Sequence, residues 1–228
     1  MPRLLQKEIE DLKRQILALA TAVEERVQMA VRAIDDRDPD LAQKVIEGDP
    51  EIDRMEVDLE EEGLKILALH QPVAVDLRWI VAVLKINNDL ERVGDLAANI
   101  ARSAAFMSAQ PPVRMPFDFA QMAAKAQAML RKSLSAFVEM DKQLAYEVCA
   151  ADDELDHMRD QVKRLVKDSI QAHPEGMEYL DHLQSVACRL ERVSDHATNI
   201  AEDVIYMVDG EIVRHRAEEH RKRCEPAA

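Results

Sequence analysis

The sequence predicts an all-α protein made of two three-helix bundles in tandem, and three observations support this prediction. Only 5 of the 228 residues are glycine and 9 are proline, whereas 47% are hydrophobic, a composition that favours helices over turn-rich β structure. Apolar residues recur every three or four positions, as on amphipathic helices. Residues 90–101, LERVGDLAANIA, return one hundred positions later as LERVSDHATNIA. A duplicated helical unit explains all three observations.

The first half predicts three helices, over about residues 4–35, 39–70 and 73–108. Apolar residues from Ile9 to Ile34 keep the spacing of one helix face through the first of them. Asp-Pro at the start of the second is typical of an N-cap followed by a first-turn proline. The Gly-Asp-Pro tripeptide at 48–50 either ends that helix and begins another or only kinks it. Gln-Pro at 71–72 ends the segment.

The second half repeats this plan after a connection. Residues 109–117, AQPPVRMPF, hold three prolines and show no helical period, so they predict a linker. Three further helices are predicted over about 118–140, 143–172 and 177–210. The resulting domain prediction is an N-terminal bundle at 1–110, a linker at 111–117, a C-terminal bundle at 118–215 and a charged tail at 216–228.

Charge and composition exclude several classes of function. The net charge of −14 repels phosphate backbones, so no nucleic-acid partner is expected, and cations or basic protein surfaces are better partners. No apolar run approaches the roughly 20 residues of a membrane span, and the N-terminus turns charged early, so we expect a soluble cytoplasmic protein without membrane insertion. The three cysteines lack C-x-x-C spacing and predict neither a disulfide framework nor a zinc knuckle.

The duplicated stretch sets two carboxylates and an amide on one helix face, turned away from the apolar stripe. The residues are Glu91, Asp95 and Asn99 in the first copy and Glu191, Asp195 and Asn199 in the second. Carboxylates one turn apart repel each other unless a cation joins them. A single such stripe is usually just solvated surface. An exposed face without a function, however, has no reason to keep Glu, Asp and Asn at the same spacing in both copies. The pair of faces therefore predicts divalent-cation sites, whose oxygen ligands suit magnesium, calcium, manganese or iron.

Two middle-helix residues are further candidate metal ligands. Asp53 and Asp156 occupy equivalent positions in the two halves, with Glu56 and Asp160 one turn further on. Solvated surface charges would give the same pattern, so both interpretations stay open here. His196 follows the second copy's aspartate and is either a ligand for a softer metal or a surface histidine.

Several motifs in order and in duplicate resemble the PhoU family of phosphate-signalling regulators. They are the two LERV cores, the sequence QPVAVDLR at 71–78 and the ending NIAEDVIYMVDGEIVRH at 199–215, which together span nearly the whole chain. The resemblance implies tandem three-helix bundles whose E-x-x-x-D motifs bind iron, zinc, manganese or magnesium in multinuclear surface sites. Carried over by position, these motifs are Glu91 with Asp95 and Glu191 with Asp195.

The resemblance also implies a regulatory role without enzymatic activity. Such proteins act in the cytoplasm, usually as homodimers. When phosphate is plentiful they link the phosphate ABC transporter, through its ATPase subunit, to a phosphate sensor histidine kinase. This link keeps the phosphate regulon off and restrains phosphate uptake.

Two other interpretations remain. The acidic faces could dock basic partner proteins directly, as a metal-free scaffold. A di-iron helical-bundle oxidoreductase needs paired Glu-x-x-His motifs, and only Glu154 with His157 fits, because its counterpart pairs Glu51 with Arg54. No Gly-rich phosphate loop of the nucleotide-binding kind is present in the sequence.

Overall fold

The computed structural model describes residues 3–111, 113 and 115–212, and the predicted tail at 216–228 lies outside them. These residues form six long α-helices and one short 3₁₀ helix. The elements are α1 (Arg3–Asp35), α2 (Pro39–His70), α3 (Ala74–Ser108), α4 (Phe119–Glu139), α5 (Lys142–Ala172), η1 (Pro174–Gly176) and α6 (Met177–Asp209). The predicted fold class, two three-helix bundles in tandem, is confirmed.

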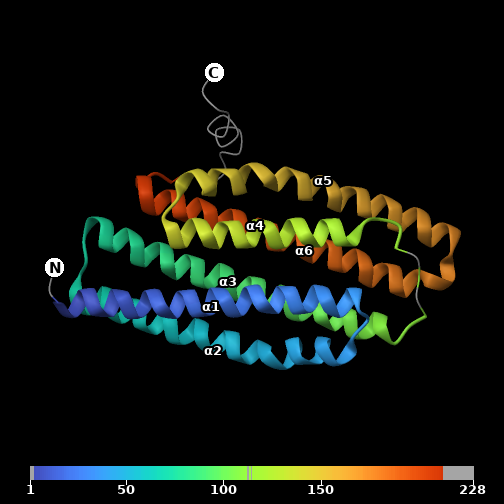
Figure 1. The fold of residues 1–228 in the computed structure, drawn as a ribbon, viewed down its shortest axis with the longest axis horizontal. Coiled ribbons are helices and arrows are strands. Elements are labelled where there is room, and N and C mark those ends of the chain that lie inside the picture. Colours follow the sequence, from blue (N-terminus) through green and yellow to red (C-terminus); the bar gives the residue numbers. More distant parts are fainter. Residues whose placement is uncertain (1–2, 112, 114, 213–228) are drawn as a thin grey trace, which may run out of the picture.

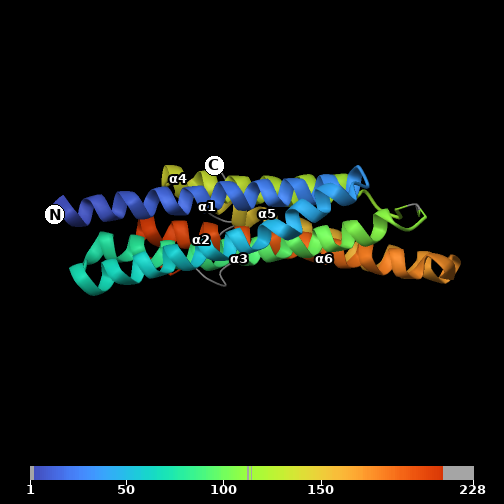
Figure 2. The same cartoon turned by 90° about the horizontal axis from the view of Figure 1, so that it is seen from below.

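The two bundles lie side by side along their length (Figure 1). Helices α1–α3 form one bundle and α4–α6 the other, joined by the connection after α3 at one end of the molecule. Helix α3 packs against α6, and α1 packs against α4, so two helix pairs join the bundles (Figure 2). The two helices that carry the duplicated motif therefore lie at the centre, against each other. We call the α3–α6 contact the seam.

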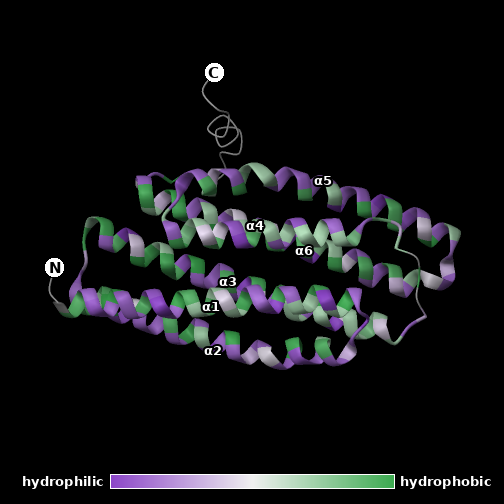
Figure 3. Ribbon diagram, in the orientation of Figure 1, coloured by the Kyte–Doolittle hydropathy of each residue, from purple (hydrophilic) through white to green (hydrophobic). Residues whose placement is uncertain are grey.

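Apolar side chains from all six α-helices form one continuous core. Hydrophobic and hydrophilic residues alternate along every helix, as the periodicity predicts (Figure 3). On α1 the predicted stripe is fully buried at Leu12, Ile16 and Leu19. None of the helices in the described residues combines the length and the apolar character that a membrane span requires.

Local signals explain where the helices begin and end. Asp38, Asp118 and Asp141 cap α2, α4 and α5, and their carboxylates accept hydrogen bonds of 2.8–3.1 Å from main-chain N–H groups of the first turn. Helix α2 ends where Gln71 takes a left-handed conformation, and α6 ends at Gly210 in the same region. The predicted boundaries follow these caps closely.

Helix α2 runs unbroken through the tripeptide at 48–50, so the alternative that two helices meet there is wrong. A Cβ atom on Gly48 would lie 2.2 Å from Cζ of Arg26, whose guanidinium crosses α2 at this point. That guanidinium lies 3.0 Å from Oε2 of Glu51 and also donates to the Lys44 carbonyl. Gly48 therefore lies where the Arg26 side chain of α1 approaches α2, and it does not end the helix.

Candidate functional site

The predicted acidic residues gather on two faces, one in each bundle. The N-terminal face consists of the carboxylates of Asp49, Asp53 and Glu56 on α2 and of Glu91 and Asp95 on α3. The C-terminal face consists of the carboxylates of Asp152 and Asp156 on α5 and of Glu191 and Asp195 on α6. In each bundle two packed helices present residues three or four positions apart, which stacks the carboxylates along the contact between the helices.

On the N-terminal face, negative charge and partial burial act together. Burial raises the pKa of Glu91, the nearby Asp95 carboxylate raises it further, and Arg92 opposes the rise. Burial likewise raises the pKa of Asp49, with Asp95 and Asp53 adding to it. The folded chain therefore holds carboxylates here whose charged forms are disfavoured without an added cation.

A buried asparagine holds one member of this face in place. The Nδ2 atom of Asn87 donates to the main-chain oxygen of Glu56 at 3.0 Å and to Oε1 of the same residue at 3.1 Å. Asn87 is 1% exposed, and its Oδ1 atom is buried without a hydrogen-bond partner. Such an oxygen costs free energy unless a donor or a cation satisfies it.

Two arginines border the N-terminal face from its exposed edges. Arg92 Nε lies 3.4 Å from Glu91 Oε2, and its Nη1 atom lies 3.6 Å from Asp95 Oδ2. Arg102 lies 3.6 Å from Asp49 Oδ2. Both guanidiniums are about half exposed, so solvent screens these ion pairs.

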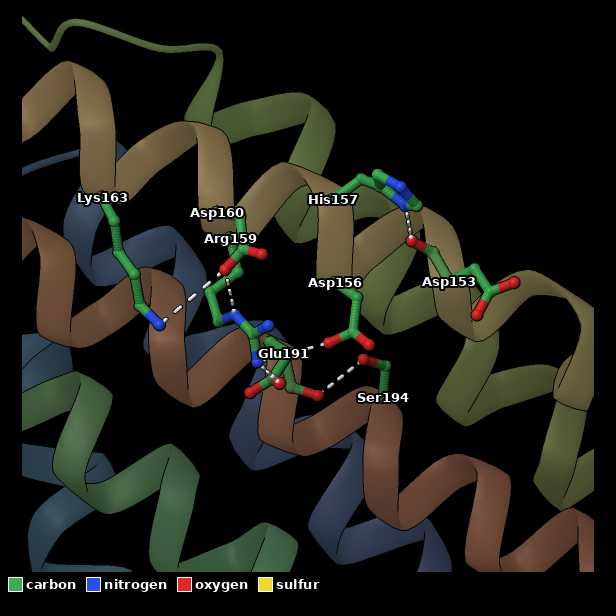
Figure 4. Close-up of polar contacts among 8 residues, drawn as sticks. All are labelled: Asp153, Asp156, His157, Arg159, Asp160, Lys163, Glu191 and Ser194. Atoms are coloured by element: carbon green, nitrogen blue, oxygen red, sulfur yellow. Dashed lines mark hydrogen bonds and ion pairs between the residues drawn. The ribbon is translucent and has the colours of Figure 1, made fainter. Parts of the chain in front are cut away.

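On the C-terminal face a guanidinium lies directly against the carboxylates (Figure 4). Arg159 of α5 donates a hydrogen bond to Glu191 and lies 3.3 Å from Asp156 Oδ1. Its Nε atom donates to Asp160 at 3.1 Å. Ser194 donates to the Glu191 main-chain oxygen at 2.6 Å. Because its side chain is only 25% exposed, Arg159 is a built-in counter-ion of this face.

The C-terminal face also holds strongly perturbed carboxyls. Burial and the Asp195 charge raise the pKa of Glu191 to about 7, against the opposing charge of Arg159. Burial and the carboxylates of Asp195 and Asp156 raise the pKa of Asp152 to about 6. The pKa of Asp195 is raised as well, first by burial and then by Asp156. These groups bind protons tightly in the absence of an added cation.

The donor chemistry of both faces suits a hard divalent cation, since the ligands on offer are carboxylate oxygens. Asn87 contacts Glu56 through its Nδ2 atom, and its Oδ1 atom is a buried acceptor without a hydrogen-bond partner. Within the described residues, however, no group of three or more His, Cys, Asp or Glu side chains stands as it would to hold a metal ion. The faces thus bring carboxylate oxygens close together but do not form a complete metal coordination site.

The two asparagines that were predicted to lie with the carboxylates have different surroundings. Asn99 donates to the Asp95 main-chain oxygen at 2.8 Å, and its own side-chain oxygen accepts from Arg102. Asn199 donates instead to Asp89 Oδ1 of α3, at 3.1 Å across the seam. Four residues along a helix turn by about 400°, so Asn199 is rotated about 40° from Asp195 and faces the other neighbouring helix.

The seam holds polar contacts that the sequence analysis missed. His196 Nδ1 lies 2.7 Å from Asp89 Oδ1, so this partly exposed histidine contacts α3 across the seam. Lys85 donates to the buried carboxylate of Asp203 at 2.8 Å. No local sequence signal identifies these pairs, because they join helices more than one hundred residues apart in the sequence.

Three residues of the faces were also missed, although the sequence carried a signal for them. Asp49 and Asp152 each stand four residues before the candidates Asp53 and Asp156, at equivalent positions of the two middle helices. The same alignment would have set Arg159 opposite Glu56. Comparing the middle helices position by position would therefore have found both the extra carboxylates and the counter-ion.

The di-iron interpretation gains no support from the structure. Glu154 is exposed and lies 2.8 Å from Lys125 of α4. His157 is exposed and contacts the Asp153 main-chain oxygen, pointing away from Glu191 (Figure 4). Neither side chain faces the interior of the bundle, where such a cofactor would lie.

Comparisons with known proteins agree with the duplicated architecture. The PhoU domain family model matches residues 16–104 and 119–204. The chain is 38% identical over 210 residues to a phosphate-specific transport system accessory protein PhoU homolog of Aquifex aeolicus, covering 92% of this chain and 95% of that protein. It is 37% identical over 209 residues to the corresponding homolog of Pseudomonas aeruginosa, covering 91% of this chain and 86% of that protein.

Solved structures share the fold along nearly their whole length. The crystal structure of PhoU from Pseudomonas aeruginosa matches with a TM-score of 0.87 and 36% identity, covering 90% of this chain and 99% of that one. The phosphate transport system regulatory protein PhoU from Streptococcus pneumoniae matches with a TM-score of 0.81 and 26% identity, covering 92% and 99%.

Proposed function

The chain belongs to the PhoU family, and from that premise we propose that it is an accessory protein of a phosphate-specific transport system and regulates phosphate transport. The observation that carries this proposal is the match of both bundles to the family over almost the whole chain. The relatives are named as accessory or regulatory proteins, which favours a role without catalysis.

The finer proposal is a metal-dependent adaptor. An added divalent cation offsets the repulsion within each acidic face and relieves the raised pKa of carboxyls such as Glu91 and Asp152. The carboxylates come from two neighbouring helices in each bundle, so a bound cation would hold α2 to α3 and α5 to α6. Iron, zinc, manganese and magnesium are the candidate ions.

The proposed partners are the ATPase subunit of a phosphate ABC transporter and a phosphate sensor histidine kinase. The protein would act in the cytoplasm as a homodimer and keep the phosphate regulon off when phosphate is plentiful. These partners, the site of action and the direction of regulation rest on the family resemblance. The acidic faces supply charge for contacts with basic partner surfaces.

The test is complementation in a strain of the source organism that lacks this chain. Phosphate uptake and a phosphate-regulon reporter are measured at high and low phosphate. Wild type is compared with a four-site amide variant, which carries Glu91→Gln, Asp95→Asn, Glu191→Gln and Asp195→Asn. The matched control removes four exposed carboxylates elsewhere, through Glu10→Gln, Glu25→Gln, Asp58→Asn and Asp168→Asn.

We expect wild type and the control to restore repression at high phosphate and the amide variant to fail. Equal repression by all three chains would show that the four motif carboxylates are not needed, which contradicts both the metal-dependent adaptor and the docking of basic partners by these residues. Failure of wild type itself to change uptake or reporter output would contradict the regulatory role.

A further inference from the structure

The two halves of the seam correspond to each other through the repeat, but they differ in charge. Helices α3 and α6 align at an offset of 100 residues, which makes Arg189 the counterpart of Asp89 and Ser103 the counterpart of Asp203. Two acidic residues in one half of the seam therefore correspond to an arginine and a serine in the other. We call these the acidic half and the arginine half.

In the acidic half, both carboxylates have partners within the chain. Asp203 accepts a hydrogen bond from Lys85 at 2.8 Å. Asp89 accepts a hydrogen bond from Asn199 at 3.1 Å and lies 2.7 Å from Nδ1 of His196. The folded protein thus compensates these charges by itself.

The arginine half lacks such compensation. Arg189 donates a hydrogen bond of 2.9 Å to Oγ of Ser103, a neutral group that is 2% exposed. In the part of the chain that the structure describes, no carboxylate lies within ion-pair distance of Arg189. Burial lowers the pKa of Arg189, and the charges of Arg102 and Arg192 lower it further, although Cys188 opposes them. A partly buried guanidinium in these surroundings is stabilised by an anion.

The Arg189 side chain is held in place with most of its donors still available. Oγ of Ser103 also lies 3.3 Å from Nδ1 of His182, and the ring of His182 stacks on Phe106 with a centroid distance of 4.0 Å. These contacts join α3 to α6 and fix the serine that orients the arginine. A guanidinium carries several N–H groups, and Ser103 takes one of them. Because Arg189 is partly exposed, the others can bind an anion from solvent.

The charge around Arg189 is positive although the chain as a whole is acidic. Arg192 is exposed on the same helix, and Arg102 on α3 is close enough to act on the pKa of Arg189. Part of the Arg102 charge is offset by Asp49, at 3.6 Å. Charges more than about 8 Å apart are largely screened at physiological ionic strength, so nearby guanidiniums outweigh the net charge of the chain at this point.

We propose that the arginine half of the seam binds inorganic phosphate, with the Arg189 guanidinium as its principal ligand. A guanidinium presents parallel N–H donors that match two oxygens of a phosphate group. The double negative charge of phosphate suits a place where more than one guanidinium is at hand. The choice of phosphate among oxyanions rests on the proposed function, and it gives the regulator a direct response to phosphate.

The experiment is isothermal titration of inorganic phosphate into the full chain, after bound metal has been removed by dialysis. Arg189→Gln removes the guanidinium, whereas Arg189→Lys keeps the positive charge without the paired donors. Arg164→Gln is the matched control, since it removes an exposed arginine of α5 instead. Thermal unfolding with phosphate or with chloride at equal ionic strength is the second measurement, and circular dichroism checks that each variant is folded.

We expect Arg189→Gln to weaken phosphate binding by about tenfold or more and Arg189→Lys by about threefold or more, whereas Arg164→Gln changes it by less than about twofold. Phosphate should raise the midpoint of thermal unfolding of wild type and of Arg164→Gln and leave that of Arg189→Gln unchanged. Because Arg189→Gln removes a partly buried charge without a carboxylate partner, the variant should fold.

Equal phosphate affinity of wild type and Arg189→Gln would overturn the inference, and so would folded wild type that binds no phosphate. Either result leaves the regulatory role standing, because complementation tests that role separately. Phosphoserine is titrated in parallel to distinguish the two sources of a phosphate group. If phosphoserine binds more tightly than inorganic phosphate, the site recognises a phosphorylated protein and the proposal of free phosphate is wrong.

Discussion

The guanidinium of Arg159 donates a hydrogen bond to the carboxylate of Glu191, so α5 supplies a cation to the second E-x-x-x-D motif. The equivalent position in the first repeat holds Glu56, which adds a negative charge beside Glu91. Two copies of one motif thus stand in opposite electrostatic surroundings. Identical spacing on a helix does not make two sites equivalent, because the neighbouring helix supplies half of the charges.

The metal-free protein should lose stability as pH rises through the acidic range. The pKa of Asp152 is raised from 3.8 to about 6 by burial and neighbouring carboxylates, so the folded chain binds this proton more tightly than the unfolded chain. The carboxyl therefore lowers the free energy of unfolding between about pH 4 and about pH 6. Asp152→Asn removes this pH dependence of the free energy of unfolding. Across that range the free energy of unfolding of the variant should rise by about 1 kcal/mol relative to wild type, a figure reduced for solvent screening.

Urea unfolding in chelator at several pH values measures this effect. The exposed Asp168→Asn is the control and should follow wild type at every pH. If the free energies of unfolding of wild type and Asp152→Asn change with pH in parallel, the pKa of Asp152 is not raised in the folded chain.

Arg37 should hold the turn between α1 and α2 to the end of α3 and to α6 of the other bundle. It lies between α1 and α2 and donates to the main-chain oxygens of Met107 at 2.8 Å and Ser108 at 3.2 Å, at the C-terminal end of α3. Its guanidinium also lies 5.9 Å from the ring of Tyr179 on α6. We expect Arg37→Ala to lower the free energy of unfolding by about 2–3 kcal/mol, since the hydrogen bonds involve a charged donor. Arg32→Ala, which loses only an exposed pair, should cost under about 0.5 kcal/mol.

Two glycines should respond differently to alanine. A Cβ on Gly94 would lie 3.0 Å from Cγ2 of the fully buried Ile52, whose branched side chain has little freedom to move, so Gly94→Ala should cost about 1–2 kcal/mol. A Cβ on Gly48 meets only the end of the flexible Arg26 side chain. Because alanine also favours the helix, Gly48→Ala should change stability by less than about 0.5 kcal/mol. Thermal unfolding distinguishes the two, and equal losses would contradict this reasoning.

The ion pair between Lys85 and Asp203 should stabilise the seam. The Lys85 Nζ atom lies 2.8 Å from Oδ1 of Asp203, which is 2% exposed. Lys85→Gln leaves a buried carboxylate with less compensation and should cost about 2 kcal/mol. Lys65→Gln, whose pair with Glu62 is on the surface, should leave the unfolding transition close to that of wild type. Similar losses from both variants in denaturant unfolding would argue against a special role for the seam.

Most of the fold could be predicted because its signals are local. The helix predicted over 73–108 is observed at Ala74–Ser108, and the one predicted over 143–172 is observed at Lys142–Ala172. Prolines, caps and apolar period lie within a few residues of each boundary. The tripeptide at 48–50 was ambiguous because the side chain that lies against Gly48 is that of Arg26, on another helix.

The site could be predicted only in part. Motif duplication identified Glu91, Asp95 and their counterparts, and the structure sets Asp53 and Asp156 beside them. The position of Asn199 could not be predicted, because it depends on the contact between α3 and α6. A rotation of about 40° along α6 is enough to turn this side chain towards α3. Which helices adjoin between the bundles is a non-local property that periodicity alone does not give.

Elemental analysis of the protein purified without a metal-affinity tag tests the central claim most directly. Wild type, the four-site amide variant at the two motifs and the matched control with four exposed carboxylates removed are compared as folded proteins. The account predicts that iron, zinc, manganese or magnesium copurifies with wild type and the control and is lost from the amide variant. Metal absent from all three, also after incubation with Mg²⁺, Mn²⁺, Zn²⁺ and Fe²⁺, or retained equally by all three, would contradict it.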